Sequence, residues 1–461
     1  MNGQRARGVA GLTVGLVLSL SCNSGLEELL PARARVAPSD ADLELVARLV
    51  HISDTHIVDE ESPARLPGAH MLTGSAWRPQ ESYSAQLLDG LVRAVNRLHA
   101  AGRHIDFLVH TGDGCDNAQT NELAWLLTVF DGGLLDPRSG PDDRPADQRP
   151  PPELDPHEPF TAQGLYRQGV HGPAPSIPWY FVIGNHDVHA LGVFPVFTDQ
   201  DGRRTAPLPL SWRPGLVLPT YLDPLADYAY SHVTPAAPGP PCLLETPQPI
   251  VSNPQRAYVS REELISALWG TVSQPPGHGF DSPRGPSWYS AAPAPGLRLV
   301  VLDTTMAATR WPGGLYMEGA VNAEQVAFLR RELERAQAAG ELVIVATHHP
   351  SESLSPALGT ALTTRQWRDL LRSCPNVILH LAGHRHRNLV TDRGGYIEME
   401  TCSTLDPPHA ARLVELWRSV LDDTVHITYE VFSEPDENWP ELGPDPLHLL
   451  RSAARDLAAP Q

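Results

Sequence analysis

The sequence is poor in cysteine and in positive charge. Its 461 residues include five cysteines, and no two of them are closely spaced, so the sequence does not indicate a zinc-binding knob built from cysteine pairs. Lys and Arg number 35 against 54 Asp and Glu, so the formal net charge is -19. Such an acidic surface repels a nucleic-acid duplex and an anionic membrane. A phosphate-bearing small molecule is still compatible with it, because bound cations can reverse the sign of the local potential.

No segment of the sequence is long and apolar enough to predict a membrane-spanning helix. The apolar stretch over residues 9–20 is too short for one, and because it follows Arg5 and Arg7 it predicts a signal peptide over residues 1–22. We therefore expect an exported protein, periplasmic or on the outer surface. The signal resembles that of bacterial lipoproteins, which would place a lipid anchor, the one expected membrane contact, at Cys22. Ordinary secretion with a coincidental cysteine is the alternative. Residues 23–42 are expected to form a polar tether.

Several buried strands each run directly into a polar cluster. These strands are predicted over residues 43–52, 105–109, 179–183, 342–346 and 377–381. Amphipathic helices are predicted between them, over residues 84–101 and 322–339, the second with Asn322 as N-cap, Gln325 completing a capping box and Gly340 ending it. Strands that alternate with helices imply a largely parallel α/β core, in which ligands bind beyond the carboxyl ends of the strands. The five clusters should therefore meet at one rim.

Two segments interrupt this pattern and are predicted to be long loop insertions. The first covers about residues 131–178, with eight prolines between Pro137 and Pro159, and the second covers about residues 194–295. The expected domain spans residues 43–434, and a tail over 435–461 follows, helical over 445–457. Further elements are expected over residues 297–302, 363–372, 396–400, 412–417 and 425–431. Aromatic residues in and beside the insertions, among them Trp179 and Tyr180, could stack on a base, although packing is their commoner role.

Seven residues of the five clusters are candidate metal ligands. Their carboxylate, imidazole and amide groups suit iron, manganese or zinc. Seven donors are too many for one tetrahedral ion, but they suit two ions that share a bridging carboxylate, because two cations about 3.5–4 Å apart repel each other strongly. Each cluster alone is more often a plain turn, so the prediction depends on all five in this order. The candidates are Asp54, His56, Asp113, Asn185, His348, His384 and His386.

The clusters resemble the signature of the calcineurin-like metallophosphoesterase superfamily. Its pattern is D-x-H, G-D, G-N-H-[DE], a lone H and G-H-x-H, and the sequence matches each part in order between Asp54 and His386. The resemblance implies a β-sandwich flanked by helices (four-layer αββα) with two divalent or trivalent metal ions at the strand ends. Purple acid phosphatases carry a tyrosine where Asp116 stands and lack a counterpart of His56, so that subgroup is not expected.

The same resemblance implies a role for each residue. Asp113 would bridge the two metals, His186 would protonate the leaving oxygen, and Asp187 would orient His186. His348 is preferred as a ligand, with His349 as the alternative. The first metal would take Asp54, His56 and His386, and the second Asn185, His348 and His384.

The expected function is hydrolysis of a phosphodiester or phosphomonoester small molecule, by in-line attack of a metal-bound hydroxide. A non-catalytic, metal-binding surface lipoprotein of the same fold is the alternative; the presence of His186 argues against it. A sulfatase or another ester hydrolase on the same metals also stays open.

Overall fold

The computed structural model describes residues 24–29, 42–65, 76–140, 150–198, 202–207, 221–226, 228–229, 248–307, 316–434 and 447–458. The predicted signal peptide and Cys22 lie outside the described residues, as does most of the predicted tether. The tether prediction is wrong for Ser24–Leu29, which form strand β1 and pair antiparallel with strand β21. In the described part of the chain, every helix falls short of the length and apolarity that crossing a bilayer requires.

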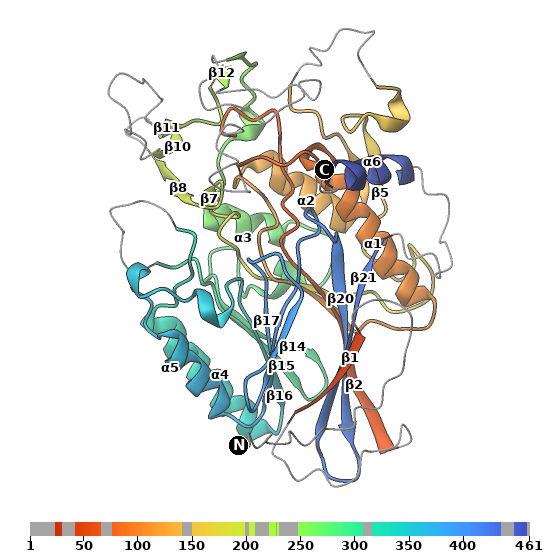
Figure 1. Cartoon of the computed structure of the whole chain (residues 1–461), viewed down its shortest axis with the longest axis vertical. Coiled ribbons are helices and arrows are strands. Elements are labelled where there is room, and N and C mark those ends of the chain that lie inside the picture. The colour runs from red at the N-terminus through yellow and green to blue at the C-terminus, as the bar shows by residue number, and fades with distance from the viewer. Residues whose placement is uncertain are drawn as a thin grey trace, which may run out of the picture.

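Two six-stranded sheets pack face to face (Figure 1). The first has the order β1-β21-β20-β2-β3-β6, in which β2, β3 and β6 are parallel. The second has the order β14-β15-β16-β17-β19-β18, in which β15, β16, β17 and β19 are parallel. Their bounds are β2 Leu43–Ile52, β3 Phe107–His110, β6 Trp179–Phe181, β14 Tyr289–Ala294, β15 Leu297–Val301, β16 Leu342–Ala346, β17 Val377–Ala382, β18 Leu389–Asp392, β19 Ile397–Glu400, β20 Ala410–Ser419 and β21 Val425–Ser433.

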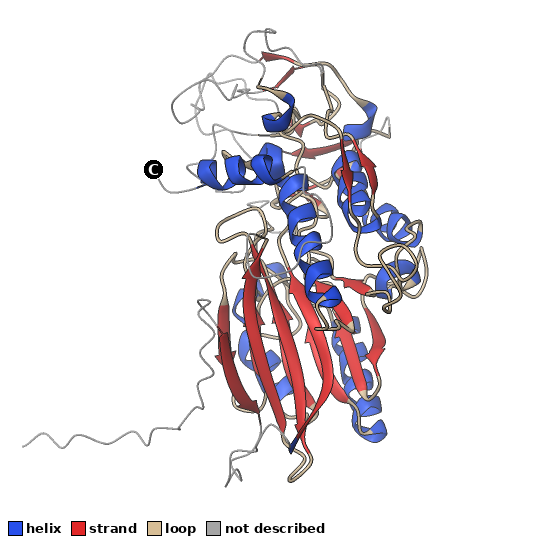
Figure 2. Ribbon diagram, turned by 90° about the vertical axis from the view of Figure 1, so that its right-hand side faces the viewer, coloured by secondary structure: helices blue, strands red, loops and turns tan. Residues whose placement is uncertain are grey.

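Helices cover the outer faces of the two sheets (Figures 1 and 2). Helices α4 (Ala323–Ala339) and α5 (Thr364–Arg372) share an apolar cluster with β15, β16 and β17. Helices α1 (Ser84–Ala100) and α2 (Thr120–Asp131) share the main core with the first sheet. The predicted β-sandwich flanked by helices is therefore confirmed.

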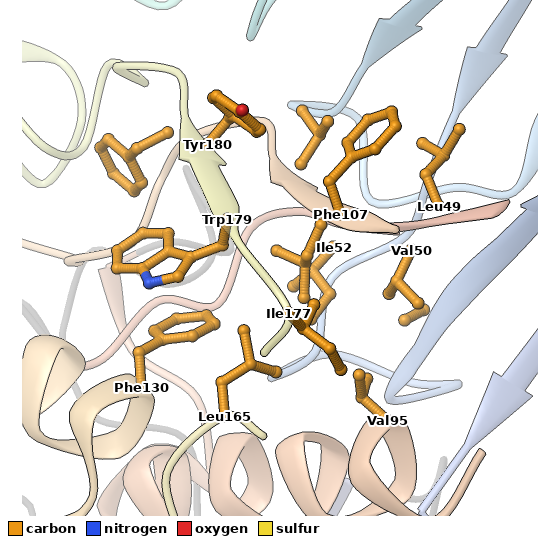
Figure 3. Close-up of a cluster of buried hydrophobic side chains, with 14 of the residues drawn as sticks. Leu49, Val50, Ile52, Val95, Phe107, Phe130, Leu165, Ile177, Trp179 and Tyr180 are labelled. Carbon is orange, nitrogen blue, oxygen red and sulfur yellow. The ribbon is translucent and has the colours of Figure 1, made fainter. Parts of the chain in front are cut away.

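The parallel strands read as nearly continuous apolar runs because both of their faces are buried. Leu49, Val50 and Phe107 are completely buried: Val50 lies on the face that α1 covers, and Leu49 and Phe107 lie on the opposite face of the first sheet (Figure 3). The rings of Phe130 and Trp179 stack with their centroids 4.5 Å apart. Each such side chain stabilises the fold by roughly 1.5–3 kcal/mol through burial. Trp179 and Tyr180 lie in this core, so base stacking is the wrong interpretation for both.

The start of α4 shows one local error of prediction. The Asn322 side chain accepts a hydrogen bond from the Gln325 N–H, and Gly340 ends the helix in a left-handed conformation with φ 68°, as predicted. The Gln325 side chain does not complete a capping box. Its Oε1 accepts from Asp303 N and its Nε2 donates to Asp303 O, both at 2.9 Å. A buried contact to the end of β15 has therefore replaced the local cap.

The two predicted insertions contain regular structure that the sequence did not reveal. The first includes a hairpin of β4 (Gly133–Leu135) and β5 (Phe160–Ala162). The second includes helix α3 (Arg261–Trp269), and it ends before residue 295 because β14 is an edge strand of the second sheet. The remaining short strands are β7 His189–Ala190, β8 Phe194–Pro195, β9 Phe197–Thr198, β10 Arg204–Pro207, β11 Tyr221–Leu222, β12 Tyr228–Ala229 and β13 Gln248–Pro249.

Helix α6 (His448–Ala458) packs against the sandwich, so the folded unit continues beyond residue 434. Its Arg451 is completely buried and pairs with Glu434 at 2.8 Å. Gly90 of α1 makes room for this pair, since a Cβ on Gly90 would lie 2.5 Å from Arg451 Cδ and 2.8 Å from Glu434 Cγ.

Gly90→Ala should therefore destabilise the protein. In an open helix position this change stabilises by about 1 kcal/mol, whereas forcing a methyl group into a filled site costs about 1–3 kcal/mol. Denaturant titration of the variant, with Arg451→Ala and the double variant as controls, measures both terms. The penalty should shrink in the Arg451→Ala background, and a Gly90→Ala variant more stable than the parent would contradict this packing.

Candidate metal centre

The seven predicted ligands follow the carboxyl ends of five parallel strands. Asp54 and His56 follow β2, and Asp113 and Asn185 follow β3 and β6 of the same sheet. The histidines at 348, 384 and 386 follow β16 and β17 of the opposite sheet. Because parallel strands present their carboxyl ends at one edge, both sheets deliver these side chains to the same rim. The six aspartates and histidines among them belong to groups whose ligand atoms lie within 4.8 Å of one another.

Asp54, His56 and His386 form one such group. The Nε2 atoms of His56 and His386 lie 3.0 Å apart. Asp54 Oδ1 lies 3.3 Å from His386 Nε2 and 3.9 Å from His56 Nε2. Donors about 2.0–2.2 Å from one ion, at right or tetrahedral angles, stand about 3.0–3.5 Å from each other. Two of the three separations therefore match donors around a single cation, and the third, from Asp54 Oδ1 to His56 Nε2, is about 0.4 Å longer than that range.

Asp113 connects this group to a second one, which consists of His348, His349 and His384. It groups with Asp54 and His348, and also with His56 and His186. Its Oδ2 lies 3.1 Å from His348 Nε2. A carboxylate that faces ligands of both groups is in the position that a bridge requires.

Asn185 contributes a buried amide oxygen. Its Nδ2 donates to Gly192 O at 2.9 Å, while its Oδ1 accepts no hydrogen bond from any described residue. Leaving a buried acceptor unpaired costs about 1–3 kcal/mol. The neighbours of Asn185 both touch Asp113, because His186 N donates to Asp113 Oδ1 and Gly184 packs on the Asp113 backbone. An oxygen donor left open beside the second group fits a metal ligand.

His348 is oriented for binding by a backbone group. Its Nδ1 donates to Thr111 O at 2.7 Å, which leaves Nε2 directed at Asp113. The adjacent His349 places Nδ1 2.7 Å from Thr304 Oγ1 and groups with His348 and His384. The contact with Asp113 favours His348 over His349 as the ligand.

The electrostatics of the centre call for positive charge. Burial lowers the pKa of His386, but Asp54 and Asp406 outweigh it and raise that pKa to about 10. At His348, burial is likewise outweighed by Asp113, and the pKa rises to about 9. The carboxylates thus hold a proton on each ring, and a bound cation would replace it, since metals and protons compete for these nitrogens. The donor set therefore fits the metal pair that the sequence pattern predicts.

The backbone of the centre is held in an unfavourable conformation. Ten described residues other than glycine have a positive φ, and five of them are predicted ligands: Asp54, His56, Asp113, His384 and His386. Left-handed backbone costs about 1–3 kcal/mol per residue and persists where the surroundings enforce it, most often at functional sites.

The glycines of the motifs allow strand ends to touch, across the two sheets at Gly383 and within the first sheet at Gly112 and Gly184. A Cβ on Gly383 would overlap Ser53 Oγ and Asp54 Oδ2, and one on Gly184 would overlap the backbone N of Asp113. A Cβ on Gly112 would lie 2.6 Å from Gly184 N. Only glycine permits this approach.

Asp116 and Asp406 lie behind two of the candidate ligand histidines, and sequence reasoning missed both. Asp116 Oδ1 lies 2.8 Å from His56 Nδ1, and Asp406 Oδ2 lies 2.6 Å from His386 Nδ1. Burial alone would raise the pKa of both carboxyl groups, but Arg65 and Arg78 at Asp116, and Arg78 at Asp406, hold these pKa values below their usual range. A carboxylate behind a ligand histidine fixes its tautomer and its orientation. The place of Asp116, three residues after Asp113, was the available signal.

His186 has a partner other than the predicted one. Its Nδ1 donates to Asp116 O at 2.7 Å, so its Nε2 is the ring atom left for a substrate. The carboxylate of Asp187 instead accepts backbone N–H groups at 2.8–3.0 Å from residues 113, 114, 115 and 184. The predicted role of Asp187 is therefore corrected: it holds two strand ends together, and Asp116 orients His186.

Three solved structures overlap with this one. A dimetal phosphatase from Danio rerio shares 16% identity at a TM-score of 0.39, with 84% of this chain and 100% of that chain covered. A putative 5'-nucleotidase from Staphylococcus aureus shares 11% at 0.39, with 89% and 58% covered. A Plasmodium protein described as the anchor in the inner membrane complex shares 9% at 0.34, with 89% and 95% covered. Likenesses this low say nothing about the activity of this chain.

No curated protein sequence matches the chain significantly. The model of the calcineurin-like phosphoesterase family matches residues 47–244, a segment that holds Asp54, His56, Asp113, Asn185 and His186. The remaining histidines lie beyond that segment but reach the same centre from the second sheet. Over residues 47–244 the chain is therefore similar to the calcineurin-like phosphoesterase family.

Proposed function

We propose that this protein is a metal-dependent hydrolase of small phosphodiesters or phosphomonoesters. The observation that carries the proposal is the geometry of Asp113, whose carboxylate lies between two groups of donors at the rim shared by both sheets. The first position would be held by Asp54, His56 and His386, and the second by Asn185, His348 and His384. Mixed nitrogen and oxygen donors favour iron, manganese or zinc in both.

A pair of cations bound here would supply an activated water and would neutralise charge on the phosphoryl oxygens. The side chains of the protein fix where this happens. Three donors follow strands of the first sheet and three follow strands of the second, and Asp113 would set the separation of the two positions. Rigid strand ends suit this purpose, because errors of 1 Å in a catalytic geometry cost about 100-fold in rate.

His186 would donate a proton to the leaving oxygen. Its Nδ1–H is committed to Asp116 O, and its backbone N–H donates to Asp113 Oδ1, so the ring is fixed beside the bridging carboxylate with Nε2 free to act. Such a residue is expected in an enzyme, whereas a site that only binds metal has no use for it. This favours catalysis over the non-catalytic alternative.

Asp113→Asn should abolish activity and lower metal content. Replacing the shared carboxylate removes charge from both positions, and we expect bound metal to fall below two ions per chain and hydrolysis of bis-p-nitrophenyl phosphate and p-nitrophenyl phosphate to fall by more than about 100-fold. Metal content is measured by elemental analysis after loading with manganese. Asp422→Asn, in the exposed turn between β20 and β21, is the matched control and should leave both quantities unchanged. A parent protein that binds no metal would refute the proposal.

His186→Ala should slow turnover while both metals stay bound. General acid catalysis contributes about 10²- to 10⁴-fold, and it matters most when the leaving group is a poor one. We therefore expect a larger loss of kcat with an alkyl phosphate ester than with its p-nitrophenyl counterpart. His171→Ala in the first insertion serves as the control. An equal loss on both substrates, or loss of metal, would show that His186 has a different role.

A further inference from the structure

Five side chains form a closed ring behind the first metal position. His56 Nδ1 lies 2.8 Å from Asp116 Oδ1, and that oxygen lies 3.1 Å from Arg78 Nη1. Arg78 Nε lies 3.0 Å from Asp406 Oδ1, and Asp406 Oδ2 lies 2.6 Å from His386 Nδ1. The Nε2 atoms of the two histidines close the ring at 3.0 Å.

Arg78 is the one member of the ring that joins its two halves behind the metal position. Asp116 and Asp406 come from different loops, 290 residues apart in the numbering of the chain. The Arg78 side chain is 6% exposed, and its guanidinium meets one carboxylate through Nη1 and the other through Nε. A planar guanidinium can serve two carboxylates at fixed angles, which a lysine ammonium cannot do in the same way.

At the second metal position, His348 is not backed by a carboxylate as His56 and His386 are. That histidine donates Nδ1–H to a backbone carbonyl, Thr111 O. The histidines of the first position are backed instead by ionised carboxylates, which make an imidazole a stronger donor than a carbonyl does. The two positions therefore differ in what lies behind their ligands, although their ligands are similar.

We propose that Arg78 is a positioning residue for the first metal position alone: by holding Asp116 and Asp406 together it fixes the separation and tilt of His56 and His386. The inference rests on the proposed metal pair. It assigns the residue no contact with the substrate and no direct contact with the metal. The consequence is selective, because loss of Arg78 should weaken one of two metals and leave the other unchanged.

Calorimetric titration of the metal-free protein with Mn²⁺ tests the proposal without reference to activity. The parent should bind two ions, and Arg78→Gln should weaken one of them by about 10- to 100-fold, the range found when partners of ligand histidines are removed. The affinity for the other ion should change by less than about twofold. Arg451→Gln, which removes an equally buried arginine paired with Glu434, should leave both affinities at parental values.

Double variants assign the weakened ion to its position. In a His386→Ala background, which already lacks the first position, Arg78→Gln should have no further effect, whereas in a His348→Ala background its full effect should persist. Arg78→Lys restores the positive charge but not the planar guanidinium, so this variant should still bind the first metal weakly. Full recovery of its affinity would overturn the claim that the guanidinium geometry matters. The positioning role alone is refuted if the parent binds two ions and Arg78→Gln either leaves both affinities unchanged or weakens both to the same extent. A parent that binds none refutes the proposed function as well.

Discussion

Two carboxylates buried beside each other set the constraint on which the rest of the centre depends. Asp54 and Asp113 are both buried. Burial by itself would raise the pKa of each carboxyl group, and the charge of Asp113 would raise that of Asp54 further, but the neighbouring histidines hold both pKa values below their usual range. A pair of negative charges persists in such a place only if positive charge is held close by. The histidines around them are oriented to meet that need, through a carbonyl at His348 and through carboxylates at His56 and His386. Arg65 and Arg78 in turn balance the outer carboxylates, so the charges alternate in sign outward from the centre.

The sandwich provides the stability that this concentration of charge requires. Left-handed backbone at the ligands and an unpaired amide oxygen at Asn185 are unfavourable, while the apolar strands that precede them are completely buried. Close contact between the two sheets also depends on residues without side chains, as Gly383 shows against Ser53 and Asp54. The motif glycines are therefore required for the geometry of the candidate metal centre, because a methyl group there would push the candidate ligands apart.

The sequence predicted the inner part of the centre and missed the outer part, for a physical reason. A ligand such as Asp54 is recognised from two local signals, its chemical type and its place at the end of an apolar strand. The role of Asp406 has no local signal, because its partners are His386, 20 residues away, and Arg78, 328 residues away. Asp187 was assigned to its sequence neighbour His186, yet the folded chain offers it four N–H groups on two loops. Helix α2 was missed for a similar reason, since its capping box begins with Gln119, a residue type that seldom marks a helix start.

The distribution of the ligands over both sheets has a consequence for how the protein matures. Each candidate metal position combines donors from the two sheets: Asp54 and His56 join His386 in one, and Asn185 joins His348 and His384 in the other. Neither half of the sandwich can therefore assemble a complete coordination sphere by itself. A growing chain presents no complete candidate site until residue 386 has been made and the sheets have docked, so on the proposed function metal capture would be a late event in biogenesis. The two bound metal ions would then hold the two sheets together, and their binding would require that the sheets have docked correctly.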